Sequence, residues 1–242
     1  MVKKKRLLEK IFLIIFIIHV SFLLSGCDTD PRHVKDVEYD FRENGGGWEP
    51  FFAGFNVGWE ERMELESDYR ALPEPLDTTD YGHFISARNI SDDVRMLFRT
   101  QIEGLEPNTS YLVGYTVRFG TEVPSGCVGI GGPPGEAVKV IANASQVKPE
   151  AIVVDDYYHI NVQYLSNNPG VWYQNAIMGD IANSRVCEEG FEYEIKEVTS
   201  GPLHDAVTAD ENGRAWLMFG TRSGFEGRTN LYYTYFRAVL AR

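Results

Sequence analysis

Apolar side chains recur at every second position in several stretches of this chain. In the clearest stretch, residues 94–102, they alternate with Arg95, Arg99 and Gln101. Successive side chains of a β-strand point to opposite faces, so this pattern predicts a strand with one buried face. The apolar members of this and the similar stretches are Val94, Met96, Phe98, Ile102, Tyr111, Val113, Tyr115, Val117, Phe119, Trp216, Met218, Tyr233, Tyr235 and Val239.

Turn-forming residues separate these stretches, and the sequence contains no long apolar segment with helical periodicity. The turns are expected at residues 43–47, 106–108, 167–170 and 210–213. Aromatic residues make up 13% of the chain, and there are 23 glycines. This composition favours an all-β fold, and we expect a β-sandwich of roughly eight to ten strands.

The first 26 residues have the organisation of a secretory signal peptide. Lys3 to Arg6 are basic, and the segment from Ile11 to Leu24 is apolar except for His19 and Ser21. A membrane-spanning helix needs about 20 apolar residues, whereas the apolar part of a signal peptide has roughly 7 to 15. Residues 1–26 are therefore interpreted as a cleaved signal peptide.

The residues from Leu24 to Cys27 resemble the lipobox of bacterial lipoproteins. The resemblance implies cleavage before Cys27, acylation of its thiol, and a lipid bilayer as partner. Two or three acyl chains give stable anchoring. The alternative is a cysteine that lies near an ordinary cleavage site by chance. Asp28 resembles the inner-membrane retention signal of enteric Gram-negative bacteria, but that rule does not extend to all phyla. We expect an envelope protein that faces the periplasm or the cell exterior.

The remaining chain is expected to be a short tether, 27–36, followed by a single domain, 37–242. The formal net charge of −12 becomes −16 once residues 1–26 are removed. Nucleic acids and anionic lipid surfaces attract basic patches, so this charge argues against both as electrostatic partners. An acidic surface is usually a solvated face, and a cation-binding role is the alternative.

If Cys27 carries lipid, Cys127 and Cys187 are the remaining cysteines. Disulfides persist in exported proteins, so we expect these two to be bonded. Two buried free thiols are the alternative.

Two motifs resemble the β-jelly-roll of carbohydrate-binding modules and galactose-binding-like domains. One is the segment from Tyr39 to Phe41 followed by Gly47 and Trp48. The other runs from Leu105 to Tyr111, where a turn leads into a strand through a tyrosine. Immunoglobulin-like sandwiches use a similar tyrosine corner, so they are the alternative fold.

The resemblance also implies a structural Ca²⁺ bound by an acidic residue after the opening phenylalanine and an aspartate in the last strand. Arg42 and Thr234 occupy these places. The sequence therefore argues against this calcium site, and no other cofactor is expected.

The sequence contains no complete catalytic or cofactor-binding motif. The glycine-rich segment 126–136 lacks the Lys-Ser/Thr of a phosphate-binding loop, so a structural or ligand-side loop pinned by Cys127 is expected. Asp210, Asn212 and Gly213 resemble a calcium loop, but Phe219 stands where glutamate is needed. Acidic residues that could bind a cation or act as the two carboxylates of a glycosidase are Asp92, Asp93, Glu136, Asp155, Asp156, Asp180, Asp205 and Glu226.

Aromatic residues near turns are the better indication of ligand binding. Trp59 follows a glycine, and Trp172 and Tyr173 follow a Pro-Gly turn. Aromatic rings stack on the C–H faces of sugars, so these three residues are the predicted glycan contacts. Burial of these rings in the core is the alternative. The expected function is binding of a carbohydrate or other small ligand. An envelope scaffold and a glycan-active hydrolase or lyase are the alternatives.

Replacement of Cys27 by alanine tests the anchoring hypothesis. Cys27→Ala removes the acceptor thiol, so we expect loss of acyl labelling and release or misprocessing of the protein. Metabolic labelling with a fatty acid, followed by membrane fractionation, measures both. A variant that is still labelled and still membrane-bound would contradict the hypothesis.

Overall fold

The structure is a computed structural model that describes residues 34–162, 177–201 and 205–242. Cys27, Trp172 and Tyr173 lie outside the described residues. Val34 to Arg242 form one compact unit built almost entirely of β-strands. In the described ranges there are only two short helical turns, α2 (Glu60–Met63) and η1 (Cys187–Glu189), and no helix is long and apolar enough to cross a bilayer.

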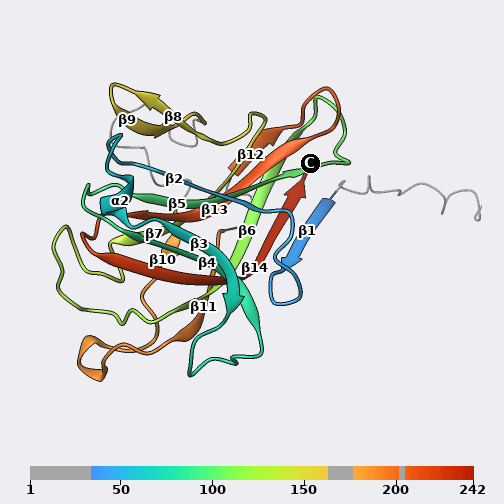
Figure 1. Cartoon of the computed structure of the whole chain (residues 1–242). Helices are drawn as coiled ribbons and strands as arrows, with labels where there is room; N and C mark the ends of the chain where they lie inside the picture. Colours follow the sequence, from blue (N-terminus) through green and yellow to red (C-terminus); the bar gives the residue numbers. More distant parts are fainter. Residues whose placement is uncertain (1–33, 163–176, 202–204) are drawn as a thin grey trace, which may run out of the picture. The chain divides into compact units, whose positions relative to one another are not determined.

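The strands form two antiparallel sheets and one separate hairpin (Figure 1). The seven-stranded sheet has the order β11 (Glu194–Thr199), β6 (Ser110–Thr121), β14 (Arg228–Ala241), β4 (Tyr81–Arg88) and β3 (Glu66–Ala71), with β1 (Val34–Asp40) beside β14 and β12 (Asp205–Thr208) beside β6. The five-stranded sheet has the order β10 (Ile177–Asp180), β7 (Val138–Ser145), β13 (Ala215–Ser223), β5 (Arg95–Ile102) and β2 (Glu49–Ala53). The hairpin consists of β8 (Ala151–Val154) and β9 (Tyr157–Ile160).

The pairing of the strands is nested along the chain. β4 pairs with β14, β5 with β13, β6 with β11, and β7 with β10. Eight strands paired from the outside inward and divided between two sheets define a jelly-roll. The fold is therefore the predicted jelly-roll, and the immunoglobulin-like alternative does not describe it.

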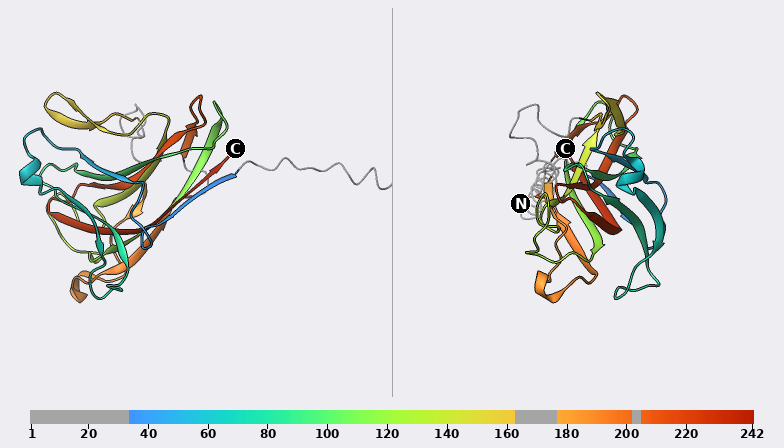
Figure 2. Two further views of the ribbon diagram at one scale, coloured as in Figure 1. Left: turned by 45° about the vertical axis from the view of Figure 1, so that its right-hand side comes forward. Right: turned by 60° about the vertical axis from the view of Figure 1, so that its left-hand side comes forward.

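β1 lies alongside the C-terminal half of β14 (Figure 2). Val34 is opposite Ala241, and Asp40 is opposite Tyr235. Residues 34–36, the last part of the segment expected as a tether, are therefore the first residues of a strand.

Aromatic rings fill the space between the two sheets. The ring of Phe219, in β13, lies 4.7 Å from that of Trp48 and 4.8 Å from that of Phe236 in β14 (centroid distances). Phe41 and Trp48, from the predicted opening motif, are both buried. The inward positions expected in β5, such as Phe98, are buried as well.

The closing strand departs from the expected alternation. The pairing of β14 with β6 shifts between Tyr233 and Tyr235, which marks a β-bulge. An extra residue reverses which face the following side chains occupy. Tyr233 and Phe236 are fully buried, whereas Tyr235 and Val239 are partly exposed. The prediction that Tyr233, Tyr235 and Val239 share one face was therefore wrong after Tyr233.

The tyrosine corner is present as expected. Tyr111 is buried, and its hydroxyl oxygen accepts a hydrogen bond from the backbone N–H of Glu106 at 2.9 Å. Asn108 has a left-handed backbone (φ 54°) that turns the chain. Leu105 is buried beside this turn, in the core position that the motif predicts.

Asp205, at the start of β12, joins the two sheets. Its Oδ2 accepts hydrogen bonds from the hydroxyl of Tyr115 in β6 (2.8 Å) and, in β7, from the side chain of Asn143 (3.0 Å) and the backbone N–H of Ala144 (2.7 Å). Tyr115 is fully buried, so water cannot replace this acceptor.

Asp205→Ala should lower the free energy of unfolding by about 2–3 kcal/mol, because it leaves these buried donors without an acceptor. Thr208→Ala on the same strand is the control. It removes an exposed hydrogen bond to Ser110 and should cost less than about 1 kcal/mol. Denaturant unfolding measures both, and equal effects of the two variants would refute this role for Asp205.

Candidate functional site

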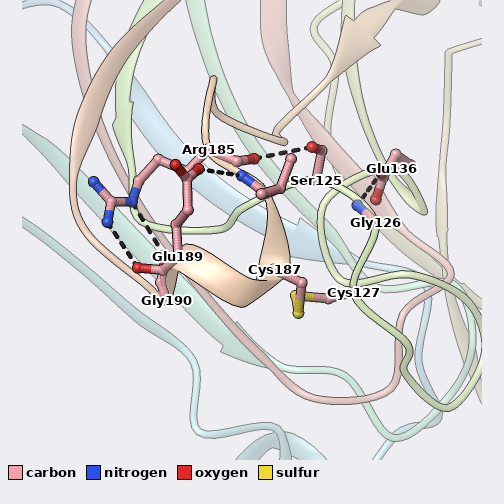
Figure 3. The surroundings of a disulfide bond; sticks show 9 residues. Ser125, Gly126, Cys127, Glu136, Arg185, Cys187, Glu189 and Gly190 are labelled. Atoms are coloured by element: carbon pink, nitrogen blue, oxygen red, sulfur yellow. Dashed lines mark hydrogen bonds between the residues drawn. A yellow bond between two sulfur atoms is a disulfide. The ribbon is translucent and has the colours of Figure 1, made fainter.

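A disulfide joins two loops at the end of the sandwich where β6 finishes and β14 begins (Figure 3). Cys127, in the β6–β7 loop, is bonded to Cys187 in η1, and their Cα atoms are 5.0 Å apart. The disulfide prediction is therefore confirmed. The backbone N–H and the hydroxyl of Ser125 both donate to the carbonyl of Arg185 at 2.9 Å, which ties the same loops together a second time.

The glycine-rich segment of the β6–β7 loop is a structural loop. The carboxylate of Glu136 accepts a hydrogen bond from the N–H of Gly126 at 2.7 Å (Figure 3). A Cβ at position 131 would lie 2.2 Å from the carbonyl oxygen of Gly224, and a Cβ at position 129 would lie 2.6 Å from the ring of Phe225. These two glycines let the loop pack closely against the β13–β14 loop and its aromatic ring.

The two disulfide-bonded loops and the β13–β14 loop surround a pocket of about 330 Å³, which we call the loop-end pocket. Phe225 and Phe191 supply aromatic rings, and 59% of Phe191 is exposed. The lining residues are Glu122, Val123, Cys127, Val128, Pro134, Cys187, Phe191, Phe225, Arg228 and Asn230.

Polar groups from two strands meet at one side of this pocket. Asn230, in β14, accepts a hydrogen bond from the Ser86 hydroxyl of β4 at 2.8 Å, and its Nδ2 lies 3.5 Å from Oε1 of Glu122. Arg228 donates to the same hydroxyl at 3.3 Å. Burial, followed by the charge of Glu122, raises the pKa of Tyr193, so its hydroxyl stays protonated beside that carboxylate.

The backbone of Phe225 is fixed before any ligand arrives. Asn89 is buried, and its side-chain amide donates to the carbonyls of Ser223 (2.9 Å) and Phe225 (2.8 Å). The N–H of Glu226 donates to the carbonyl of Ile130 in the neighbouring loop at 2.8 Å. A wall held by several hydrogen bonds loses little conformational entropy on binding.

Of the three predicted aromatic contacts, only Trp59 is among the described residues, and it does not line this pocket. Trp59 is half-buried at the start of α2, where it packs against the core and the guanidinium of Arg62 lies 4.8 Å from its ring centroid. Trp172 and Tyr173 lie outside the described residues. The prediction for these three residues stays a prediction. Phe191 and Phe225 were missed, and the signal that could have found them is an apolar residue inside a turn rather than a strand.

Most of the predicted acidic residues lie apart in separate structural roles, whereas Asp92 and Glu226 lie side by side. Asp155 and Asp156 both have positive φ and form the two-residue turn of the β8–β9 hairpin. Asp180 binds Lys196 at 2.8 Å. Glu226 is exposed and lies beside Asp92, and partial desolvation, followed by the charge of Asp92, raises the pKa of Glu226.

The turn at residues 210–213 is also structural. Oδ1 of Asp210 accepts hydrogen bonds from the N–H groups of Asn212 (2.8 Å) and Arg214 (2.9 Å). Within the described ranges no group of three or more histidine, cysteine or acidic side chains is placed to hold a metal ion.

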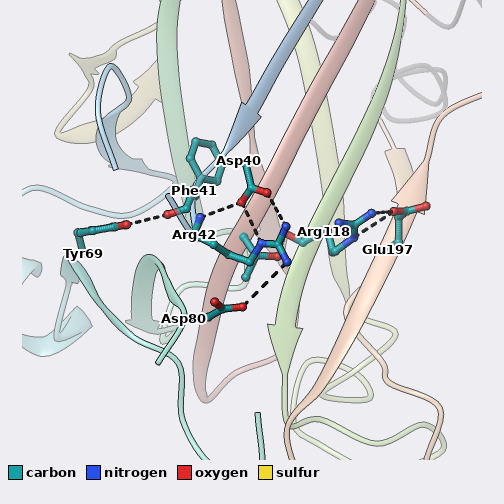
Figure 4. A network of polar contacts seen from close by, with 8 residues as sticks. Asp40, Phe41, Arg42, Tyr69, Asp80, Arg118 and Glu197 are labelled. Carbon is teal, nitrogen blue, oxygen red and sulfur yellow. Dashed lines mark hydrogen bonds and ion pairs between the residues drawn. The ribbon is translucent and has the colours of Figure 1, made fainter. Parts of the chain in front are cut away.

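Arg42, which stands where the resemblance implies an acidic calcium ligand, lies among acidic side chains (Figure 4). The guanidinium of Arg42 binds the carboxylate of Asp40, with Nε at 2.9 Å, and lies 4.0 Å from that of Asp80. The N–H of Phe41 donates to the carbonyl of Thr234. Arg42 and Thr234, the two residues that replace the expected acidic ligands, therefore lie close together. This arginine holds the pKa of Asp40 below its ordinary value. These residues do not fit a calcium ion.

The sequence matches no protein-family model and no curated protein. Solved structures similar to this chain include TmCBM27, a carbohydrate-binding module described for specific mannan recognition (TM-score 0.38, 13% identity, 86% of this chain and 99% of that chain). Another is the structure of the CBM22-1–GH10 modules of Clostridium thermocellum xylanase 10B (TM-score 0.36, 11% identity, 85% of this chain and 28% of that chain). A third is bacteriophage CBA120 tailspike protein 4 (TM-score 0.31, 12% identity, 81% of this chain and 20% of that chain). The chain thus spans less than a third of these last two proteins. Similarity at this level identifies no ligand or activity.

Loss of the disulfide should loosen the wall of the loop-end pocket and destabilise the domain. The bond closes a loop with a sequence separation of 60 residues, so the Cys127→Ser/Cys187→Ser variant should lose about 2–4 kcal/mol of unfolding free energy. Denaturant unfolding of the oxidised protein and the double variant measures this. If reductant also lowered the stability of the double variant, the effect would not come from this bond.

Proposed function

We propose that this protein is a lipid-anchored, extracytoplasmic protein whose β-sandwich binds a carbohydrate in the loop-end pocket. One observation carries the proposal: two phenylalanine rings and three hydrogen-bonding side chains converge on one preformed pocket. The anchoring part rests on the lipobox resemblance at Cys27.

The chemistry of the pocket suits a sugar ring. Phe191 and Phe225 offer faces for the C–H groups, and the side chains of Glu122, Asn230 and Arg228 can bind hydroxyls. The volume is at the small end of ligand pockets, which typically span roughly 300–1,000 Å³. A terminal sugar unit, or another small ligand of similar size, therefore fits better than the middle of a polymer.

The described lining favours binding over hydrolysis. Glu122 is the one carboxylate among the lining residues that the structure describes, whereas most glycoside hydrolases use two. The alternative of a protein-interaction surface has its own support. Val128 is 98% exposed and Ile130 72% exposed beside the pocket, and exposed apolar groups often mark protein contacts.

A glycan array with the mature protein, followed by calorimetry with the best glycan, tests the proposal. Phe191→Ala should weaken binding about tenfold, because it removes a stacking surface, and Glu122→Gln should weaken it to a similar extent. Tyr81→Ala is the matched control, since Tyr81 is 43% exposed and lies outside the pocket.

Two outcomes would overturn the pocket assignment. The first is that the array shows no glycan binding. The second is that Trp59→Ala abolishes binding while Phe191→Ala does not, which would favour the shallow surface predicted from the sequence.

A further inference from the structure

The polar side of the loop-end pocket is a chain of hydrogen bonds that runs in one direction. Arg228 can only donate, and it donates to the Ser86 hydroxyl at 3.3 Å. That hydroxyl in turn donates its own proton to Oδ1 of Asn230 at 2.8 Å. The bond fixes the orientation of the Asn230 amide, whose Nδ2 faces Oε1 of Glu122 at 3.5 Å. The chain of donors therefore ends at the carboxylate of Glu122.

Tyr193, the residue before β11, joins the same carboxylate. Its hydroxyl hydrogen-bonds with the side chains of Glu122 and Asn230. An ionised carboxylate can only accept, so the tyrosine gives its proton to Glu122 and accepts from Nδ2 of Asn230. The amide donors of Asn230 are thus directed at Tyr193 and Glu122. What Glu122 and Asn230 leave for a ligand is acceptor capacity, so the ligand group that meets them must be a donor.

The charge of Glu122 is not balanced by a cation of the chain. Arg228 is the one lysine or arginine among the described lining residues, and its guanidinium binds the carboxylate of Glu64, which Arg88 also binds at 3.2 Å. Among the residues that the structure describes, Glu122 forms no ion pair with a lysine or arginine. Residues 163–176 and 202–204 contain neither residue type, so those segments supply no such partner.

Two further features of the pocket favour a cationic donor on the ligand. The first is the pair of phenylalanine rings, Phe191 and Phe225, because the face of an aromatic ring attracts an ammonium group. The second is the composition of the chain, in which 35 acidic residues outnumber 23 basic ones. The field of such a protein draws cations to its surface and repels anions.

We propose that the glycan bound in the loop-end pocket contains an amino sugar, whose ammonium group pairs with Glu122. A hydrogen bond between two charged groups is about twice as strong as a neutral one. The sugar ring would stack on Phe191 and Phe225, and the remaining N–H groups of Arg228 would donate to its hydroxyl oxygens. A uronic acid would instead place a carboxylate against Glu122. The amino-sugar site rests on the carbohydrate-binding function proposed for the pocket and narrows it to one class of sugar.

NMR titration of the mature protein with three disaccharides of the same linkage tests this proposal. They are the disaccharides of glucosamine, N-acetylglucosamine and glucose, which differ in carrying an ammonium, an amide or a hydroxyl at the same carbon. The wild-type protein should bind the glucosamine disaccharide about fivefold more tightly than the other two, and the preference should shrink as salt rises. Glu122→Gln removes the charge and should bind all three with similar affinity.

Glu188→Gln is the matched control, because Glu188 is an exposed glutamate next to Cys187 that does not line the pocket. It removes the same charge from the same end of the domain and should keep the preference for glucosamine. Equal affinity for the three disaccharides, no binding of the glucosamine disaccharide, an unchanged preference in Glu122→Gln, or an equal loss in Glu188→Gln would each overturn the proposal. The carbohydrate-binding function fails separately, if the glycan array shows no binding or if Phe191→Ala leaves the affinity for the best glycan unchanged.

Discussion

The packing of Phe219 between the two sheets is the contact on which the rest of the domain depends. Its ring is within 6.0 Å (centroid to centroid) of five other aromatic rings, which belong to Phe41, Trp48, Phe98, Tyr233 and Phe236. These rings come from β5, β14 and the segment between β1 and β2, so one side chain of β13 holds both sheets and the opening segment together. The same strand β14 that supplies Tyr233 and Phe236 to this cluster begins with Arg228 and Asn230 at the pocket. The position of the pocket is therefore fixed by the core.

The loop-end pocket is shaped by constraints that act in the absence of a ligand. A disulfide and the hydrogen bonds of Ser125 hold two loops together, and the buried side chain of Asn89 fixes the third.

Those features that depend on local periodicity or local turn chemistry could be predicted from the sequence. The strands of β5 and β6, the tyrosine corner at Tyr111 and the structural turn at Asp210 are examples. The disulfide was predictable because only two cysteines remained. The bulge at Thr234 was not, because a single extra residue has no periodic signal of its own. Phe191 and Phe225 could not be predicted, because turn residues follow no alternation that shows which way a side chain points. Glu122 could not be predicted either, because it meets Asn230, 108 positions away, only through strand pairing.

The register of β14 relates the pocket to the start of the domain. Val34 pairs with Ala241 at one end of β14, whereas Asn230 lines the pocket near the other end. A strand rises about 3.3 Å per residue, so these two positions are separated by roughly 35 Å along the sheet. With the anchor proposed at Cys27, only a few residues precede Val34, and the chain enters the domain at the end opposite the pocket. Under the proposed anchoring at Cys27, an opening at the far end of the domain would reach polymers beyond the bilayer, whereas a pocket near Val34 would face the lipid headgroups. The proposed anchor and the proposed glycan pocket are thus compatible with one role, capture of a glycan at a distance from the lipid surface.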